Sequence, residues 1–242
     1  MSDRQVIRPT GEGESRFAKI VYWTSQHALL GVFKVYFRIT IEGKENLPKD
    51  GAFVLAPIHR SYLDTLLMCI IPRRLRFMGK DSMWKMKWSA WLLSTLGGFP
   101  VSRDSADREA LQTTVAHITA GEPTVLFPEG ERKSGPRTHP LKEGAVYVAA
   151  RTGVPIVPVG IGGSESAMPK GRNFIRPAKI HVIVGEPVQP PPKKESGRVS
   201  RRSVTAVTDE LREVLQGLYD RAQERCGHPN VYLPGSEPES AG

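Results

Sequence analysis

The chain has 242 residues, enough for one sizeable hydrophobic core with short appendages at its ends. Its 34 lysine and arginine residues outnumber 25 aspartate and glutamate residues, which gives a formal net charge of +9 and predicts an anionic partner. Nucleic acid, a phospholipid surface and an anionic substrate all meet that condition. The two cysteines, Cys69 and Cys226, lie far apart without metal-ligand spacing, which argues against a disulfide framework and indicates a reducing cytosol.

The composition of the chain changes from polar to apolar at residue 16. Residues 1–15 are polar with two glycines, so we expect a loose N-terminus, and they lack the pattern of a signal peptide. Residues 16–42 are aromatic and apolar, but polar residues interrupt them short of the roughly 20 apolar residues that spanning needs. On a helix, one face of this segment would carry Leu29, Val32, Phe33, Tyr36 and Phe37. We expect an amphipathic helix that either packs on the domain core or lies at the surface of an anionic phospholipid membrane.

A histidine follows the first strong strand signal. The apolar run 52–56 predicts a strand that ends at Pro57, with His59 in the following turn and Asp64 in the first turn of a helix over 64–71. A carboxylate on one imidazole nitrogen fixes the tautomer and leaves the other nitrogen free to take a proton from a hydroxyl. Because this spacing also occurs by chance, a helix cap at Ser61 with a solvated Asp64 is the alternative.

The next segments place an arginine at a strand end. We expect a strand over 75–78 and a helix over 80–96, whose tryptophans at 84, 88 and 91 form either a core stripe, an acyl pocket or an interfacial foot. Residues 97–103 predict an extended stretch that ends at Arg103. A guanidinium there is suited to a phosphate, because its planar fork pairs two oxygens at once. A surface ion pair with Asp104 or Asp107 is the alternative.

A second polar cluster follows the buried strand expected over 124–127, after a helix over 104–120. Glu129 and Gly130 come directly after that strand, at its carboxyl end, where open α/β sheets build their sites. The cations that follow within a dozen residues predict either a phosphate site or a solvated basic loop; they are Arg132, Lys133, Arg137 and Lys142.

The remaining segments complete an α/β pattern. A helix over 145–151 precedes a strand over 154–159, whose two prolines indicate an edge or bulged position. Residues 160–176 are expected to form a glycine-rich basic loop without nucleotide-binding spacing. A strand over 179–185, an amphipathic helix over 204–218 and a loose tail over 227–242 follow. Together these elements predict a mixed sheet flanked by helices.

Four motifs occur in a fixed order. They are His59-x4-Asp64, the segment Gly97–Arg103, the segment Phe127–Arg132 and the segment Val154–Val159. This set resembles the glycerolipid acyltransferase family over roughly residues 35–187, with bacterial 1-acylglycerol-3-phosphate acyltransferases the most similar members. The sequence departs from the family pattern at Ile58, Glu131 and Lys133, which leaves the acceptor open.

The resemblance implies a function and a set of roles. A fatty acyl group would pass from acyl-CoA or acyl carrier protein to the free hydroxyl of lysophosphatidate, forming phosphatidate. His59 would act as general base with Asp64 orienting it, in an acyltransferase domain over 43–226, and no metal or bound cofactor would be needed. Acceptor binding would fall to a further set of residues: Arg103, Glu129, Gly130, Arg132 and Lys142.

Three further expectations concern the acceptor, the location and the partners. Glycerol 3-phosphate, another lysophospholipid or a glycolipid could replace lysophosphatidate as acceptor. The enzyme is expected at the cytoplasmic face of the cell membrane, as a peripheral or monotopic protein. Nucleic-acid binding is not expected, because the aromatic residues lie in apolar runs and do not alternate with the basic ones.

Overall fold

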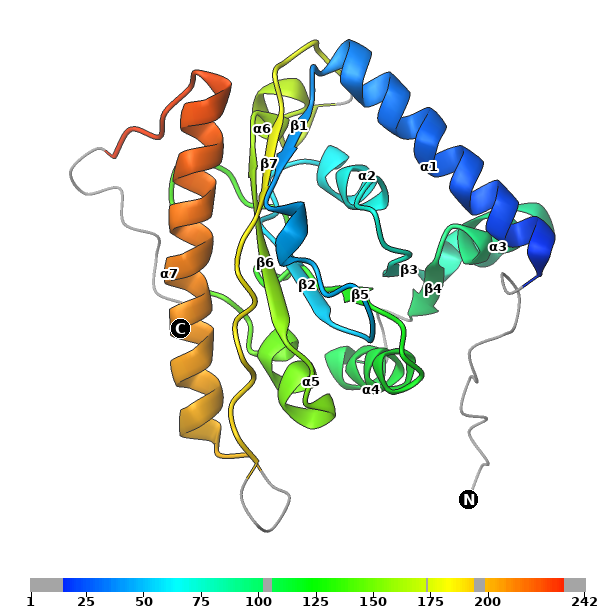
Figure 1. The fold of residues 1–242 in the computed structure, drawn as a ribbon, viewed down its shortest axis with the longest axis vertical. Coiled ribbons are helices and arrows are strands. Elements are labelled where there is room, and N and C mark those ends of the chain that lie inside the picture. The colour runs from blue at the N-terminus through cyan, green and yellow to red at the C-terminus, as the bar shows by residue number, and fades with distance from the viewer. Residues whose placement is uncertain (1–14, 102–105, 173, 194–198, 233–242) are drawn as a thin grey trace.

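The computed structural model describes residues 15–101, 106–172, 174–193 and 199–232. Its centre is a seven-stranded sheet with the strand order β1-β7-β6-β2-β5-β3-β4 (Figure 1). All neighbouring strands are parallel except β6 and β7, which pair antiparallel. In sheet order the strands are β1 Thr40–Glu42, β7 His181–Val184, β6 Ile156–Gly162, β2 Val54–Pro57, β5 Thr124–Val125, β3 Arg76–Lys80 and β4 Gly98–Val101. The predicted mixed α/β sheet is therefore confirmed.

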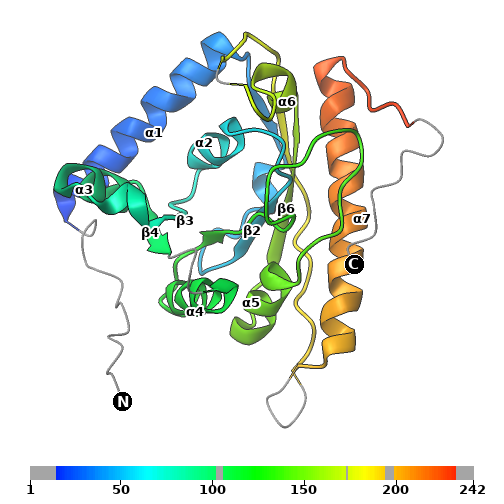
Figure 2. The ribbon, with the colours of Figure 1, turned by 180° about the vertical axis from the view of Figure 1, so that it is seen from behind.

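Helices cover both faces of this sheet. Seven α-helices are described: α1 Arg16–Tyr36, α2 Leu63–Cys69, α3 Lys87–Thr95, α4 Ala106–Thr119, α5 Gly144–Thr152, α6 Ser164–Ala167 and α7 Arg201–Cys226. Figure 2 shows α7 on one side of the sheet and α1 with α2 on the other. The alternation of β2 decides which core each side chain joins: Leu55 packs with residues of α1 and α2, while Val54 and Ala56 pack with residues of α4, α5 and α7.

The two-proline strand is central, so the expected edge position is wrong. β6 lies between β7 and β2, and all seven of its residues are buried. Pro155 precedes the strand, and the carbonyl of Pro158 accepts a hydrogen bond from Gly185, one residue beyond the end of β7. The missing N–H of Pro158 therefore falls where the β6–β7 ladder ends, and the sheet loses little pairing.

Glycines in β6 let α7 approach the sheet closely. A Cβ on Gly160 would lie 2.5 Å from the Leu218 backbone, and one on Gly162 would lie 2.3 Å from the Ala222 carbonyl oxygen. Residues 160–162 thus belong to a strand and not to the loop expected over 160–176. α7 is also longer than expected and extends to Cys226.

The segment expected as one helix over 80–96 is three elements. β3 extends to Lys80, a 3-10 turn, η2, covers Asp81–Trp84, and α3 begins at Lys87. A Cβ on Gly79 would meet the Trp84 ring at 2.7 Å, and the Trp84 indole donates to Ser94 Oγ, so this ring fills the angle between β3 and α3. Trp88 and Trp91 instead remain exposed.

α1 has two apolar faces. Ser15 caps the helix by accepting the Ala18 amide, and Tyr22 and Phe33 lie in the buried face. The Gln26 amide donates to the carbonyls of Cys69 and Ile71, which fixes the helix against the end of α2. The other face exposes a series of large apolar side chains: Phe17, Ile20, Trp23, Val32 and Val35. Within the described ranges, no helix has both the length and the hydropathy to span a membrane.

Candidate active site

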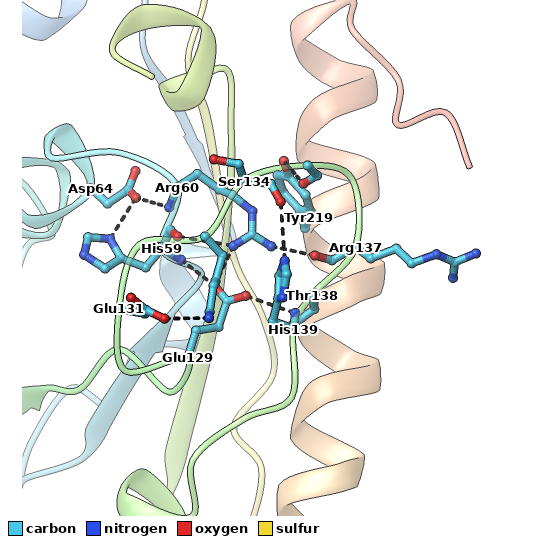
Figure 3. Close-up of polar contacts among 12 residues, drawn as sticks. His59, Arg60, Asp64, Glu129, Glu131, Ser134, Arg137, Thr138, His139 and Tyr219 are labelled. Atoms are coloured by element: carbon cyan, nitrogen blue, oxygen red, sulfur yellow. Dashed lines mark hydrogen bonds and ion pairs between the residues drawn. The ribbon is translucent and has the colours of Figure 1, made fainter. Parts of the chain in front are cut away.

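The site lies where two neighbouring parallel strands end. β2 leads through Ile58 to His59, and β5 leads through Phe127 to Glu129. The carboxyl ends of parallel strands share one edge of a sheet, so these two turns meet, as Figure 3 shows. The Lys133 amide donates to the His59 carbonyl at 2.9 Å, which joins the turn after β2 to the loop after β5.

His59 and Asp64 form the pair that their spacing predicts. His59 Nδ1 lies 3.1 Å from Asp64 Oδ2, and the imidazole stacks on Phe127 with ring centroids 4.0 Å apart. The carboxylate places the ring proton on Nδ1, so Nε2 becomes the acceptor nitrogen. The His59 side chain is 15% exposed, while Asp64 is fully buried. The imidazole of the pair is therefore partly open to solvent, and its carboxylate is not.

Asp64 also shapes the turn that carries His59. Its Oδ2 accepts the backbone amides of Arg60 at 2.6 Å and Ser61 at 2.7 Å. Two amides and an imidazole therefore converge on one oxygen and hold the carboxylate in a fixed orientation. The alternative of a helix cap at Ser61 with a solvated Asp64 is wrong for Asp64, because this carboxylate is fully buried. Ser61 Oγ caps in addition, accepting the Leu63 amide at 3.2 Å.

Beneath the dyad lies a buried ion pair that the sequence did not suggest. Arg60 Nη1 donates to Glu129 Oε2 at 2.7 Å, and neither side chain is exposed. Glu129 Oε2 also accepts the His59 amide at 3.1 Å, and its Oε1 accepts the His139 amide at 3.1 Å. These contacts turn the Glu129 carboxylate toward groups inside the protein, whereas the resemblance implied acceptor binding. No signal in the sequence identified Arg60 as the partner of Glu129, because that contact depends on the side chain of Arg60 pointing away from its neighbour His59.

The loop after Glu129 is attached to α7. Arg60 Nη2 donates to the Arg137 carbonyl at 2.9 Å, and its guanidinium lies 5.1 Å from the Tyr219 ring centroid. Burial raises the pKa of Tyr219 to about 12, although Arg60 opposes the shift. The phenol therefore stays protonated and donates to the Gly135 carbonyl. Gln216 adds a second attachment by accepting the Thr138 amide at 2.6 Å.

Two cationic side chains, Arg132 and Lys142, belong to the loop after Glu129. The Arg132 guanidinium stacks 3.3 Å from the ring centroid of Tyr62, and within the described ranges its buried Nη1 has no hydrogen-bond partner. Lys142 lies against Gly130, whose φ of 73° suits glycine and where a Cβ would meet the lysine side chain at 2.6 Å. Gly130 therefore makes room for Lys142. The stack of Arg132 on Tyr62 joins the segment Phe127–Arg132 to the turn between His59 and Asp64. The spacing of residues in the sequence did not predict this contact.

Glu131 lies among these cations. Lys133 Nζ donates to Glu131 Oε1 at 2.7 Å. This hydrogen bond and the positive charges of Lys133, Lys170 and Lys142 lower the pKa of Glu131. Arg103 lies outside the described residues, so its expected place at the phosphate stays a prediction. Across the described ranges, no three or more His, Cys, Asp and Glu side chains are grouped so that they could hold a metal ion.

Comparison with known proteins identifies a family to which this chain is similar. The acyltransferase family model matches residues 38–162, which is more than half of the chain and contains both turns of the site. The chain belongs to the acyltransferase family. It is therefore an enzyme of the O-acyltransferase type.

Individual relatives extend the comparison. The chain is 28% identical to the 1-acyl-sn-glycerol-3-phosphate acyltransferase of Bacillus subtilis over 84% of its own length and 100% of that protein. It is 30% identical to a chloroplastic 1-acyl-sn-glycerol-3-phosphate acyltransferase of Arabidopsis thaliana, over 63% of its own length and 44% of the relative. The chain thus matches less than half of that plant protein.

A solved structure shares the fold. The crystal structure of the 1-acyl-sn-glycerophosphate acyltransferase of Thermotoga maritima superposes with a TM-score of 0.69 at 28% identity. The match covers 83% of this chain and 79% of that one. This acyltransferase therefore has its sheet and helices arranged as in that enzyme.

Proposed function

We propose that this acyltransferase transfers a fatty acyl group from a thioester, acyl-CoA or acyl carrier protein, to the free hydroxyl of 1-acylglycerol 3-phosphate. The hydrogen bond between His59 Nδ1 and buried Asp64 is the observation that carries the proposal, because it leaves Nε2 as a base at the edge of the sheet. The names of the Bacillus and Thermotoga relatives support the choice of lysophosphatidate as acceptor.

The reaction needs one base and no covalent enzyme intermediate. His59 Nε2 takes the proton of the acceptor hydroxyl, and the oxygen forms a bond to the thioester carbonyl carbon. The C–S bond of the resulting tetrahedral intermediate then breaks, and the leaving thiolate takes the proton from the imidazolium. Asp64 stabilises the imidazolium and keeps the ring in place. The products are phosphatidate and the free thiol.

The cations near Glu129 are the proposed phosphate site. The guanidinium of Arg132 stacks on Tyr62, and among the described residues its Nη1 has no hydrogen-bond partner; its planar fork suits a pair of phosphate oxygens. Lys142 adds a charge beside Gly130. Arg103 and Gly130 belong to the same proposed site, with Arg103 as a second phosphate ligand.

The exposed face of α1 is the proposed membrane contact. Its apolar side chains lie beside those of α3, since the rings of Phe17 and Trp91 stack with centroids 6.1 Å apart. Lys19 and Lys34 flank this face, which suits anionic headgroups. We place the enzyme on the cytoplasmic face of the cell membrane, where a water-soluble acyl donor and a lipid acceptor meet.

The first test is thiol release from a long-chain acyl-CoA with detergent-dispersed lysophosphatidate, compared with glycerol 3-phosphate and with no acceptor. We expect release that requires lysophosphatidate and falls by about 10²- to 10⁴-fold in His59→Ala, the range of a positioned general base. His228→Ala is the matched control, because His228 is exposed after the end of α7. An unchanged rate in His59→Ala would remove the mechanism.

The second candidate function is acyl transfer to a different acceptor, and the position of the Glu131 carboxylate favours it. A carboxylate paired with Lys133 occupies part of the cationic surface proposed for phosphate. Competition between lysophosphatidate, glycerol 3-phosphate and an uncharged monoacylglycerol in the same assay separates the candidates. Release that is fastest with the uncharged acceptor would replace the first proposal with the second.

A further inference from the structure

Two carboxylates hold three successive backbone amides in the turn that carries the proposed base. Asp64 accepts the amides of residues 60 and 61, and Glu129 accepts the amide of His59 at 3.1 Å. His59 is thus fixed at both ends, at its ring by Asp64 and Phe127 and at its backbone by Glu129. Figure 3 shows Glu129 directly beneath the turn, with Arg60 beside it.

The Glu129 carboxylate is closed to solvent. The residue is 2% exposed, and its two oxygens take donors from three separate residues, at positions 59, 60 and 139. Arg60 is fully buried and uses both terminal nitrogens on protein oxygens, those of Glu129 and of the Arg137 carbonyl. An acceptor could reach Glu129 only if this ion pair opened.

We propose that Glu129 and Arg60 form a positioning pair for His59 and that neither binds the acceptor. Arg60 Nη1 pairs with Glu129 Oε2 inside the protein at 2.7 Å, and the same oxygen holds the His59 amide. The pair also joins this turn to the loop over 134–139, which α7 anchors. The inference rests on the proposed role of His59 as base. It gives Glu129, in the segment Phe127–Arg132, the role of positioning His59.

The energetics of a buried pair suggest how to test it. Removing one partner leaves an uncompensated buried charge and is strongly destabilising, whereas removing both charges is often nearly neutral. The set is therefore Glu129→Gln, Arg60→Met and the double variant, in which the glutamine oxygen can still accept the His59 amide. Glu122→Gln is the matched control, because Glu122 pairs with Arg76 and His117 rather than with groups of the site.

We measure kcat and the acceptor KM by thiol release, and thermal unfolding of each variant. Each single variant is expected to lose kcat by about 10²-fold, the cost of a misplaced catalytic group, with the KM changed less than about threefold. The double variant should be no slower than either single variant and should regain thermal stability. Glu122→Gln should lose stability while keeping kcat. Either a tenfold rise in KM with kcat unchanged in Glu129→Gln, or losses that multiply in the double variant, would overturn the proposal.

A second readout does not depend on the acceptor. The ¹⁵N NMR signals of the His59 ring report its hydrogen bond to Asp64. We expect these signals to change in Glu129→Gln and to stay as in wild type in Glu122→Gln; unchanged signals in both would overturn the positioning role. If wild type fails to turn over any acceptor, the proposed function fails, while the NMR comparison still decides whether the pair positions His59.

Discussion

At the scale of single residues, Glu131 distinguishes this chain from the usual family motif. Its carboxylate is 62% exposed and lies 2.7 Å from Lys133 Nζ, on the surface proposed for the acceptor phosphate. The negative charge both neutralises a lysine and repels a phosphate. Solvent screens the interaction, so its effect on affinity is expected to be small and dependent on salt.

Glu131→Gln should lower the KM for a phosphate-bearing acceptor by about two- to fivefold, the scale of an exposed ion pair. The measurement is the KM for lysophosphatidate at low and high salt, beside an uncharged monoacylglycerol. The gain should shrink at high salt and be absent for the uncharged acceptor. An equal gain for both acceptors would show that the carboxylate acts on something other than phosphate.

Sequence spacing identified the site only where the contact partners are close in the chain. His59 and Asp64 are five residues apart, so a turn followed by a helix was enough to predict their hydrogen bond. Glu129 and Arg60 are 69 residues apart, and their contact depends on the pairing of β2 with β5. Arg60 also follows the base directly, and adjacent residues in a turn can point in opposite directions.

At the scale of elements, the contact between α7 and β6 depends on the absence of side chains. Gly160 and Gly162 face the α7 backbone at distances that leave no room for a methyl group. The sequence indicated an amphipathic helix that packs back on the domain, but it did not indicate the strand involved. These glycines were instead expected in a loop, because glycine is disfavoured in strands unless another backbone comes close.

Gly162→Ala should destabilise the fold by about 1–3 kcal/mol, because the new methyl group would lie 2.3 Å from the Ala222 carbonyl oxygen and push α7 away. Chemical denaturation measures this change. Gly217→Ala is the matched control: Gly217 is an exposed position of α7 where a new methyl group would have nothing within 4 Å, and there alanine should raise stability through helix propensity. Two variants of equal stability would contradict the role given to Gly162.

At the scale of the whole molecule, a polar cluster links the amino ends of two strands to α4. Glu122 accepts hydrogen bonds from His117 at 2.6 Å and from Arg76. Burial raises the pKa of Glu122, but these two hydrogen bonds outweigh it and lower the pKa from 4.5 to about 2. A folded pKa below the unfolded value means that the carboxylate stabilises the fold above pH 4.5 and loses this effect as pH falls toward 2.

Glu122→Gln should therefore be less stable than wild type at neutral pH, by about 1–3 kcal/mol once solvent screening is included. The difference in unfolding free energy should narrow between pH 4.5 and about 2. Denaturant unfolding of both proteins at several pH values measures it. If the difference in unfolding free energy stayed constant over that range, the contacts with His117 and Arg76 would not be what lowers the pKa of Glu122.

The proposed membrane contact through α1 also belongs to the scale of the whole molecule, because it requires α1 and α3 to expose apolar side chains on one surface. Val35 is 84% exposed and Ile20 is 59% exposed. The double variant Ile20→Asp with Val35→Asp should bind anionic vesicles at least about tenfold more weakly, since it removes apolar area and adds repelling charge. Vesicle co-sedimentation measures binding, with Thr205→Asp on the exposed face of α7 as control. Equal binding of all three proteins would place the membrane contact elsewhere.

The sequence by itself determined the α/β class, the order of most elements and the His59–Asp64 pair, because each depends on periodicity or on residues within one or two turns. It left two uses for the α1 helix. The structure shows that one face packs on the core and the other is exposed, and membrane contact of the exposed face stays a prediction. The central place of β6, the two glycines under α7 and the Glu129–Arg60 pair were decided only by tertiary structure. These features depend on which strands become neighbours, and strand order is set by packing over the whole chain.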